Sequence, residues 1–364
     1  MRILHVITTL DIGGAERLMV DLLPQLRDMG HKVELLLFNG VNTEFRTELE
    51  HIGIKIYELT YSRDVNSGHL KVYYPWNVFK VRKFLDRYDI IHTHNTACQL
   101  YVPIAKTLSG KKTTLVTTEH SSNNRRRDIR WFKPIDKWMY NRYDAVVCIS
   151  DKARNSLEDY IGKGKNVLTI NNGVDVKRFL RPIKDVARQD SFVITMVAGL
   201  RAEKDHETLL RAMTHLPVNY HLQLVGRGVR EDELKTLTRE LGLNERVAFM
   251  GMRSDVPQIL EQSDIVVLSS HWEGLSLSSV EGMASGRPFI ASDVDGLREV
   301  VGGAGVLFPH GDDEALAREI QNLCENPELY RKTAEACQER AKQYDISVMA
   351  EKYSDLYKSL METR

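Results

Sequence analysis

Residues 2–38 read RILHVITTLDIGGAERLMVDLLPQLRDMGHKVELLLF, an apolar run, a glycine pair, a helical pattern and a second apolar run. The first run predicts a strand over residues 2–9, and Gly13 and Gly14 open a helix that extends to residue 29. The second run predicts another strand over residues 31–38. A strand, a helix and a strand in this order form a right-handed βαβ unit, so the sequence predicts an α/β fold.

The alternation of apolar runs and helical patterns continues along the chain, which at 364 residues is long for one domain and sufficient for two. A linker is expected at residues 180–191, and the pattern is helical from residue 312 onward. Polar residues or glycines bound the further strands that we expect, at residues 54–59, 90–94, 114–118, 145–149, 167–170, 192–198, 220–225 and 246–250.

Charge is balanced over the whole chain but not along it. Residues 1–180 hold 28 Lys and Arg against 20 Asp and Glu, and the remaining residues hold 22 against 30. A basic first half suits an anionic surface, although solvated side chains alone give the same counts. The four cysteines have neither metal-ligand nor disulfide-framework spacing, which predicts reduced thiols in a cytoplasmic protein: Cys98, Cys148, Cys324 and Cys337.

Membrane contact, if present, is expected to be peripheral. No stretch approaches the roughly 20 apolar residues of a transmembrane helix, and residues 1–10 lead into DIGGAER without a cleavage pattern. Residues 123–142, NNRRRDIRWFKPIDKWMYNR, interleave aromatics with basic residues from Arg125 to Arg142, as at an anionic membrane interface. A helix with inward aromatics and solvated charges fits this segment equally well. Nucleic acid is disfavoured because no recognised binding motif accompanies it.

Two glutamates flank an expected helix start in the second half. An apolar run at residues 264–268 ends in small polar residues, Glu273 and Gly274 turn the chain, and a helical pattern begins near Ser276. The first turn of a helix offers unpaired N–H groups and a positive dipole end, which suit a phosphate. Glu273 in the loop and Glu281 on the helix can accept hydroxyl protons, which suggests a nucleotide sugar. An isolated pair of glutamates is more often surface charge.

Other strand ends carry cations, histidines and glycines. Arg201 and Lys204 precede a helix expected at residues 207–213, where cations are unfavourable at the positive dipole end unless an anion binds. His94 and His120 close or follow two strands, although a single histidine there is more often structural than catalytic. Taken alone, Gly13 and Gly14 favour close packing, and the Gly-x-Gly that begins at Gly226 is weak support for nucleotide binding.

Residues 269–301, SSHWEGLSLSSVEGMASGRPFIASDVDGLREVV, resemble the signature of retaining family-4 glycosyltransferases of the GT-B fold, of the bacterial surface-polysaccharide type. GGAER after the first strand and NGVD at residues 172–175 resemble two further family segments. The resemblance implies two doubly wound Rossmann-like domains facing across a donor cleft, residues 1–180 with a helix at 345–364, and residues 181–344. The signature matches at Glu273, Gly274, Glu281, Gly286, Pro288, Gly296, Glu299 and Val300.

The resemblance also implies roles for single residues. Catalysis would rest on Glu273 and His120 at the donor sugar and on Arg201 and Lys204 at the diphosphate. Glu281 would hold the ribose, and the other expected substrate contacts are Gly13, Gly14, His94, Gly274, Leu275, Ser276, Gly226 and Arg253. Asp293-Val-Asp295 spells a metal-binding D-x-D but lies in the SDVDGLREV loop, so we expect no metal and no cofactor beyond the nucleotide sugar.

The expected reaction moves a hexose or N-acetylhexosamine from a uridine-linked nucleotide diphosphate sugar to a hydroxyl acceptor with retained anomeric configuration. The acceptor would be a glycan or a lipid-linked glycan in cell-surface polysaccharide biosynthesis. Two alternatives fit the same fold. A nucleotide-sugar epimerase would convert the donor without an acceptor, and a non-catalytic protein would bind the sugar nucleotide without turnover.

Overall fold

The computed structural model describes residues 1–11, 13–62, 71–120, 127, 129–164, 166–186 and 190–363. The chain divides into two compact units, Met1–Gly173 with Ile346–Arg364, and Val174–Asp345. The first boundary lies before the expected residue 180, because α7 (Val176–Phe179) packs against α11 (Leu277–Ala284) of the second unit. Val174, Val176 and Phe179 accordingly belong to the core of that unit.

The first unit is a seven-stranded parallel sheet in the order β3-β2-β1-β4-β5-β6-β7. In its register Ile3 of β1 lies opposite Val33 on one side and Ile90 on the other. Both faces are covered by helices, which explains why apolar residues on both faces of strands such as β1 are buried. The strands are β1 (Arg2–Ile7), β2 (Lys32–Gly40), β3 (Lys55–Tyr61), β4 (Ile90–His94), β5 (Thr114–Glu119), β6 (Ala145–Cys148) and β7 (Val167–Thr169).

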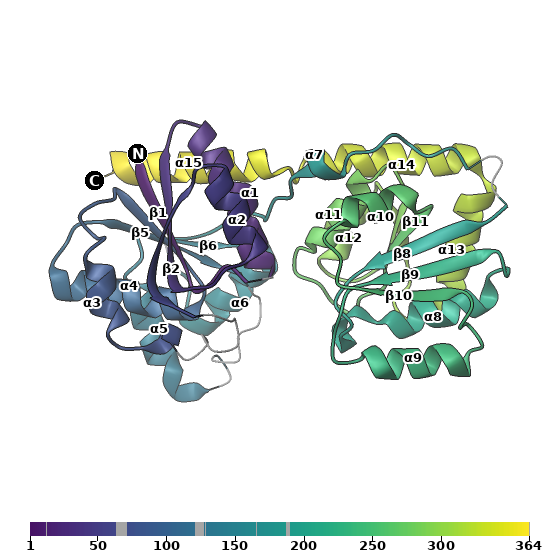
Figure 1. Cartoon of the computed structure of the whole chain (residues 1–364), viewed down its shortest axis with the longest axis horizontal. Helices are drawn as coiled ribbons and strands as arrows, with labels where there is room; N and C mark the ends of the chain where they lie inside the picture. The colour runs from purple at the N-terminus through teal and green to yellow at the C-terminus, as the bar shows by residue number, and fades with distance from the viewer. Residues whose placement is uncertain are drawn as a thin grey trace. The chain divides into compact units, whose positions relative to one another are not determined.

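Alternate residues of each strand face two different helical layers (Figure 1). On one face Ile3 and Ile7 pack with α1 (Gly14–Asp28), α2 (Glu44–His51) and the C-terminal α15 (Ile346–Glu362). On the other face Leu4 and Val6 belong to the cluster formed with α3 (Asn77–Arg82), α4 (Thr96–Ser109), α5 (Lys133–Tyr140) and α6 (Asp151–Ile161). The short helices η2 (Lys71–Tyr73) and η4 (Arg130–Phe132) complete this unit.

The second unit is a six-stranded parallel sheet in the order β10-β9-β8-β11-β12-β13. Its strands are β8 (Phe192–Val197), β9 (Tyr220–Val225), β10 (Val247–Gly251), β11 (Ile265–Leu268), β12 (Phe289–Ser292) and β13 (Val306–Phe308). Besides α7, α11 and η5 (Ala202–Lys204), its helices are α8 (His206–His215), α9 (Glu231–Glu240), α10 (Val256–Gln262), α12 (Leu297–Val301), α13 (Asp313–Glu325) and α14 (Pro327–Lys342).

Both sheets confirm the predicted α/β class and share one topological feature. The strand order reverses between β1 and β4 in the first unit and between β8 and β11 in the second. In open α/β sheets, ligands bind at the carboxyl ends of the strands where the order reverses. These two edges are therefore the places to look for a site.

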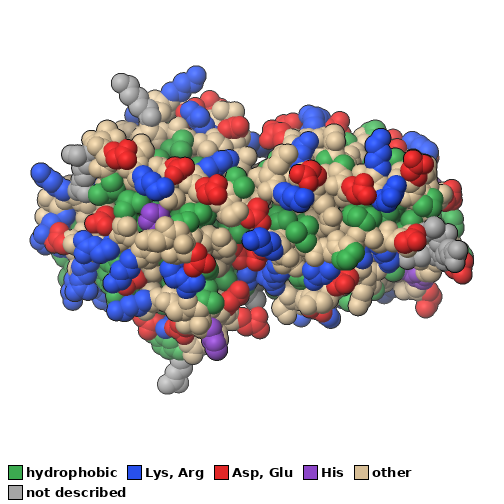
Figure 2. All heavy atoms as spheres, turned by 90° about the horizontal axis from the view of Figure 1, so that it is seen from above, with side chains coloured by type: hydrophobic (Ala, Val, Ile, Leu, Met, Phe, Trp, Pro, Cys, Tyr) green, Lys and Arg blue, Asp and Glu red, His purple; other side chains and the backbone are tan. Residues whose placement is uncertain are grey.

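The surface and the helices bear on membrane contact. No helix within the described ranges is long and apolar enough to cross a membrane. Figure 2 shows Lys and Arg side chains gathered toward the outer edge of the first unit, at the left, with Asp and Glu among them.

Candidate functional site

The loops after β8 and β11 bring two sequence-predicted residues together. Lys204 ends η5 after β8, and Glu273 lies in the loop after β11, 69 positions further along the chain. The Nζ atom of Lys204 is 2.5 Å from Oε1 of Glu273. The hydroxyl of Ser270 donates to the same oxygen at 2.7 Å. A cation and a carboxylate thus meet at the switch point of the second sheet.

This pair is largely removed from solvent. The exposed fraction of Glu273 is 8%, so its carboxylate needs the lysine charge and the serine hydroxyl to compensate its lost hydration. An anionic ligand that approaches Lys204 would compete with Glu273 for the ammonium group. The pair is therefore suited to an exchange in which an anion takes Lys204 and the released carboxylate takes hydroxyl groups.

Two glycines let neighbouring backbone approach these loops closely. Gly296 has φ +85°, and a Cβ there would lie 2.2 Å from the carbonyl oxygen of Gly274 and 2.6 Å from that of Glu273. Gly226, expected from the sequence as a substrate contact, has φ +146°, and its Cβ would lie 2.0 Å from the carbonyl oxygen of Ala198. Both positions need glycine because L side chains disfavour positive φ and because no space exists for a Cβ.

The start of α11 lies directly after the glutamate loop. The helix begins at Leu277, where the sequence predicts it, and Gly274, Leu275 and Ser276 precede it. Ser276 forms no side-chain capping bond, and its hydroxyl is 3.0 Å from that of Ser278. The first amide groups of α11 are thus not capped by this side chain, while Glu281 lies further along the same helix.

The other predicted cations of this unit differ in how they are paired. The Arg201 side chain is 68% exposed, and its carboxylate contact with Glu203 is 4.0 Å long. Arg253 instead forms a close ion pair with Asp255 at 2.6 Å. Arg201 is the better placed of the two for an anionic ligand, because its charge is the less compensated.

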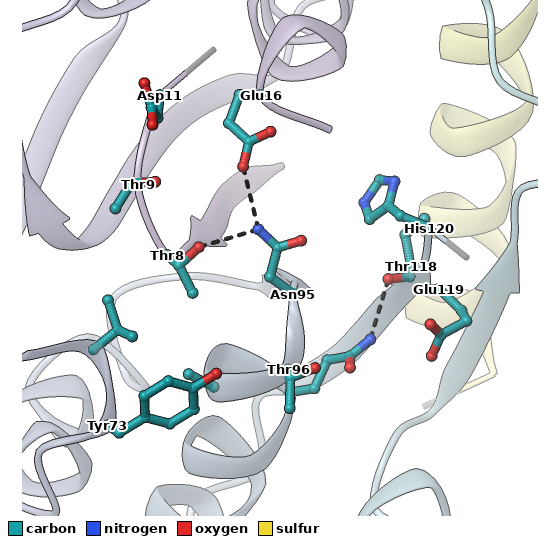
Figure 3. A pocket seen from close by; sticks show the side chains of 13 residues that line it. Thr8, Thr9, Asp11, Glu16, Tyr73, Asn95, Thr96, Thr118, Glu119 and His120 are labelled. Atoms are coloured by element: carbon teal, nitrogen blue, oxygen red, sulfur yellow. Dashed lines mark hydrogen bonds between the residues drawn. The ribbon is translucent and has the colours of Figure 1, made fainter. Parts of the chain in front are cut away.

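A cavity of about 470 Å³ marks the switch point of the first unit (Figure 3). Its walls come from the ends of β1, β4 and β5, from the beginnings of α1 and α4, and from η2: Thr8, Thr9, Asp11, Glu16, Val72, Tyr73, Asn95, Thr96, Ala97, Gln99, Thr118, Glu119 and His120. Of the residues predicted for this unit, His120 lines the cavity. The wall has three carboxylates and several hydroxyls, which suits a ligand rich in hydroxyl groups.

Asn95 and Glu16 were not singled out from the sequence, although they lie within HTHN and GGAER. The Asn95 amide donates to Thr8 Oγ1 at 3.1 Å and to Glu16 Oε1 at 3.4 Å (Figure 3). Burial raises the pKa of Glu16. Asn95 has φ +65°, a strained conformation that clusters at functional sites. The predicted Gly13 lies against Glu16, since a Cβ at Gly13 would be 2.3 Å from Oε2, whereas Gly14 faces open space.

His94, expected as a substrate contact, lies beneath the cavity and not on its wall. It is fully buried, and its Nδ1 is 2.9 Å from Nε2 of His120. Its Nε2 is 3.0 Å from Nδ1 of His5. Burial lowers the pKa of His5 to about 3 and that of His120 to about 4, and the pKa of His94 lies well below the usual value. The three rings are therefore neutral near pH 7.

Two groups of described side chains have metal-ligand spacing, with ligand atoms within 4.8 Å of one another. One is His5, His92 and His94; His92 already bonds to Thr118 and Tyr357. The other is Asp205, His271 and His310, in which His271 Nδ1 is 2.6 Å from His310 Nε2. The D-x-D aspartates belong to neither group, since Asp293 and Asp295 both pair with Arg298.

A doubly wound unit with a cation, a carboxylate and a helix start at its switch point defines a class of nucleotide-binding proteins. The family described as Glycosyl transferases group 1 matches residues 147–343, and the family described as Glycosyltransferase Family 4 matches residues 12–178. The chain belongs to the group 1 glycosyltransferases and is a glycosyltransferase.

Relatives cover nearly the whole chain. The lipopolysaccharide core biosynthesis glycosyltransferase LpsD of Rhizobium meliloti is 26% identical and spans 98% of both chains. The UDP-Gal:alpha-D-GlcNAc-diphosphoundecaprenol alpha-1,3-galactosyltransferase of Escherichia coli is 29% identical over 58% of this chain and 59% of that protein. Among solved structures, Anabaena HepE in complex with UDP is 25% identical, with a TM-score of 0.83 over 99% of this chain and 100% of that one. The fold is GT-B.

Proposed function

We propose that this glycosyltransferase moves a hexose or N-acetylhexosamine from a uridine diphosphate sugar to a hydroxyl of a glycan or lipid-linked glycan, with retention. The observation that carries the proposal is the contact between Lys204 and Glu273 at the β8/β11 edge, which sets a cation for the diphosphate beside an acceptor for sugar hydroxyls. HepE binds UDP, and the Escherichia coli relative is named for UDP-Gal and a diphosphoundecaprenol acceptor. LpsD supports a place in cell-surface polysaccharide synthesis.

In the proposed step the bond from the sugar C1 to the diphosphate oxygen breaks as the acceptor oxygen bonds to C1, and the acceptor's proton passes to the leaving diphosphate oxygen. Negative charge grows on the leaving diphosphate, and Arg201, Lys204 and the first amides of α11 would stabilise it. Lys204 turns from Glu273 to the diphosphate when the donor binds, which frees Glu273 for the sugar hydroxyls. These groups supply the positive charge in the proposal, which includes no metal or other cofactor.

Three further residues would position the substrates. Glu281 on α11 would hold the ribose, as the family resemblance implies. His120 would bind a sugar hydroxyl from the cavity of the first unit, and Asn95 would share that wall. These contributions are ones of orientation, which lower the barrier without proton transfer by the side chains. Glu273→Ala should mainly lower turnover, and Glu281→Ala should mainly weaken nucleotide binding.

A lipid-linked acceptor would bring the first unit to the membrane surface at the cytoplasmic face. The basic segment expected for this contact lies partly outside the described residues, which do not include Arg125 and Arg126. Arg127 is directed inward, since it donates to Ser156 at 2.9 Å and lies 3.7 Å from Glu119. Trp131 of the same segment is 66% exposed. Among the described residues of this segment, Arg127 therefore adds little exposed positive charge.

A second surface of the first unit also fits this contact. Four exposed aromatic side chains follow one another near η2 and α3: Tyr73, Tyr74, Trp76 and Phe79. Lys80, Arg82 and Lys83 follow them within four residues of Phe79. Aromatic rings favour the membrane–water interface, and each basic residue near an anionic surface adds about 1 kcal/mol of attraction. Tyr73 also lines the cavity, so a lipid-linked acceptor held at this surface would lie next to it.

The test pairs a donor screen with membrane acceptors. Purified protein is incubated with UDP-sugars and bacterial cell-envelope lipid extract, and UDP release and glycosylated lipid are measured by mass spectrometry. Transfer that requires both substrates and is lost in Glu273→Ala supports the proposal. Epimerised donor without an acceptor would replace it with the epimerase, and UDP binding without transfer to any acceptor would replace it with a binding protein.

A further inference from the structure

Three histidine rings form a hydrogen-bonded chain from the cavity into the first sheet. His120 lines the cavity and contacts His94 through Nε2, and His94 contacts His5 through its own Nε2. The chain ends at Nε2 of His5, a fully buried nitrogen with no hydrogen-bond partner in the described part of the molecule. At the other end, Nδ1 of His120 is the ring nitrogen left for a ligand in the cavity.

The protons of such a chain are not independent. A neutral imidazole has one N–H donor and one bare acceptor nitrogen. Each hydrogen bond between two rings therefore joins the N–H of one ring to the bare nitrogen of the other. If His5 carries its proton on Nδ1, then His94 must carry its proton on Nδ1, and so must His120. If His5 carries its proton on Nε2, all three carry it there, and His120 presents a bare nitrogen to the cavity. Burial keeps the rings neutral by lowering each pKa.

Two observations favour the first arrangement. In the second one, a buried N–H of His5 would have no acceptor, and orphaned buried donors are rarer than under-satisfied acceptors. The cavity wall also carries the carboxyl groups of Asp11, Glu16 and Glu119 (Figure 3). In a cavity whose wall carries carboxylates, an N–H at the surface is electrostatically favourable, whereas a lone pair there is not. A hydroxyl that donates to one of these carboxylates keeps its lone pairs for His120.

We propose that His94 and His5 are positioning residues that hold the proton of His120 on Nδ1, so that His120 donates a hydrogen bond to a hydroxyl oxygen of the sugar substrate. The identity of the ligand rests on the proposed function. The tautomer itself is a property of the substrate-free protein. It can therefore be refuted without refuting the proposed function, and the proposed function can be refuted without refuting the tautomer. A chain that fixes the tautomer also fixes which substrate oxygen His120 can bind, because a donor accepts no hydroxyl proton.

His92 is a matched control for this chain. It is fully buried, lies two residues before His94 on β4, and stacks on it with ring centroids 4.4 Å apart. Its nitrogens instead bond to the hydroxyls of Thr118 and Tyr357, at 2.7 and 2.6 Å. A substitution at His92 therefore disturbs the same region of the sheet without removing a link of the chain.

The direct test is a ¹⁵N-histidine long-range correlation spectrum of the whole protein without substrate, which separates protonated from bare ring nitrogens. His120 is assigned from the signals absent in His120→Asn. We expect His120 to show a protonated Nδ1 and a bare Nε2. His94→Asn retains an amide N–H close to the place of Nδ1 and should preserve this tautomer, as should His92→Asn. His94→Leu removes the donor and should mix the two tautomers.

Turnover provides the second readout. His94→Leu should lower kcat by about tenfold, the effect of one lost hydrogen bond, with KM for the nucleotide sugar little changed. His94→Asn should restore kcat to near the wild-type value. The proposal is overturned if His120 carries its proton on Nε2 in the wild type. It is also overturned if His94→Leu changes neither the tautomer nor kcat, or if His92→Asn lowers both as much as His94→Leu does.

Discussion

Lowering the pH below 6.5 should destabilise the first unit, because its buried histidines stay neutral in the folded state. The expected decrease in the free energy of unfolding follows from how strongly burial lowers their pKa values. His5, His92 and His94 are 0% exposed, and burial places the pKa of each well below its usual value of 6.5, for His5 at about 3. Below pH 6.5 these histidines therefore bind protons in the unfolded chain but remain neutral in the folded chain. Stability from this source is complete above pH 6.5 and is lost as the pH falls below that value.

The expected loss is comparable with the stability of a whole domain. Each such histidine lowers the free energy of unfolding by about 1.4 kcal/mol per pH unit below pH 6.5, so at pH 5 each costs about 2 kcal/mol and the three together cost about 6 kcal/mol. Whole domains are stable by about 5–15 kcal/mol. The raised pKa of Glu16 acts in the opposite direction, because its stabilisation is lost as the pH rises, and it offsets the effect of at most one histidine. His120 of the same unit, with a pKa lowered to about 4, adds about 2 kcal/mol to the loss at pH 5. In the second unit His206, with a pKa lowered to about 4, accounts for about 2 kcal/mol.

Urea unfolding between pH 7 and pH 5 measures this slope, and hydrogen exchange of peptides from β4, β5, β8 and β11 assigns it to a unit. His5→Asn should reduce the slope of the first unit by about 1.4 kcal/mol per pH unit. His51→Asn removes an exposed histidine of the same unit and serves as the control. A first unit whose stability is flat over this range, or a slope that His5→Asn leaves unchanged, would refute the reasoning.

Two further predictions concern the surface and the glutamate loop. Trp76→Ser with Phe79→Ser should weaken binding to anionic liposomes at low salt by about tenfold or more, as buried apolar area is lost. Val229→Ser, at a 93% exposed position of the second unit, should not, and equal binding by both variants would exclude this surface as the contact. Gly296→Ala should lower the free energy of unfolding by about 1–3 kcal/mol more than Gly311→Ala and abolish turnover, since both have positive φ but only Gly296 meets backbone. Equal melting temperatures and turnover in these two variants would contradict that clash.

Sequence patterns predicted most of the strands, including the three-residue β7, and missed two other short ones. Residues 90–94 and 220–225 form β4 and β9 with the expected bounds, because an apolar run ends at a polar residue or glycine in both. β12 (Phe289–Ser292) and β13 (Val306–Phe308) were not expected. Each has only a few residues, and their strand geometry comes from pairing with β11 and with one another. Whether such short segments form strands depends on pairing with strands distant in the sequence, which a local sequence pattern does not reveal.

The candidate site was predictable where chemistry lies at strand ends. Lys204 and Glu273 meet because β8 and β11 are neighbours whose carboxyl ends share one edge, as doubly wound sheets require. His5 gave no signal, since it lies within an apolar run and acts through His94, which belongs to another strand. Arg127 counted as membrane-facing charge by composition, yet its side chain points toward Glu119. Side-chain direction in irregular segments depends on neighbours that the local sequence does not specify.

In the proposed function the loops after β8 and β11 bind the diphosphate of a nucleotide sugar, which replaces Glu273 as the partner of Lys204. Calorimetric titration of UDP into the wild type, Lys204→Met and Glu273→Gln tests it most directly. Lys204→Met should weaken UDP binding by about tenfold or more, the effect of losing a charge-assisted hydrogen bond. Glu273→Gln should bind UDP at least as tightly as the wild type, because the ammonium group no longer leaves a carboxylate 2.5 Å away. Equal weakening in both variants, or none in Lys204→Met, would contradict the account.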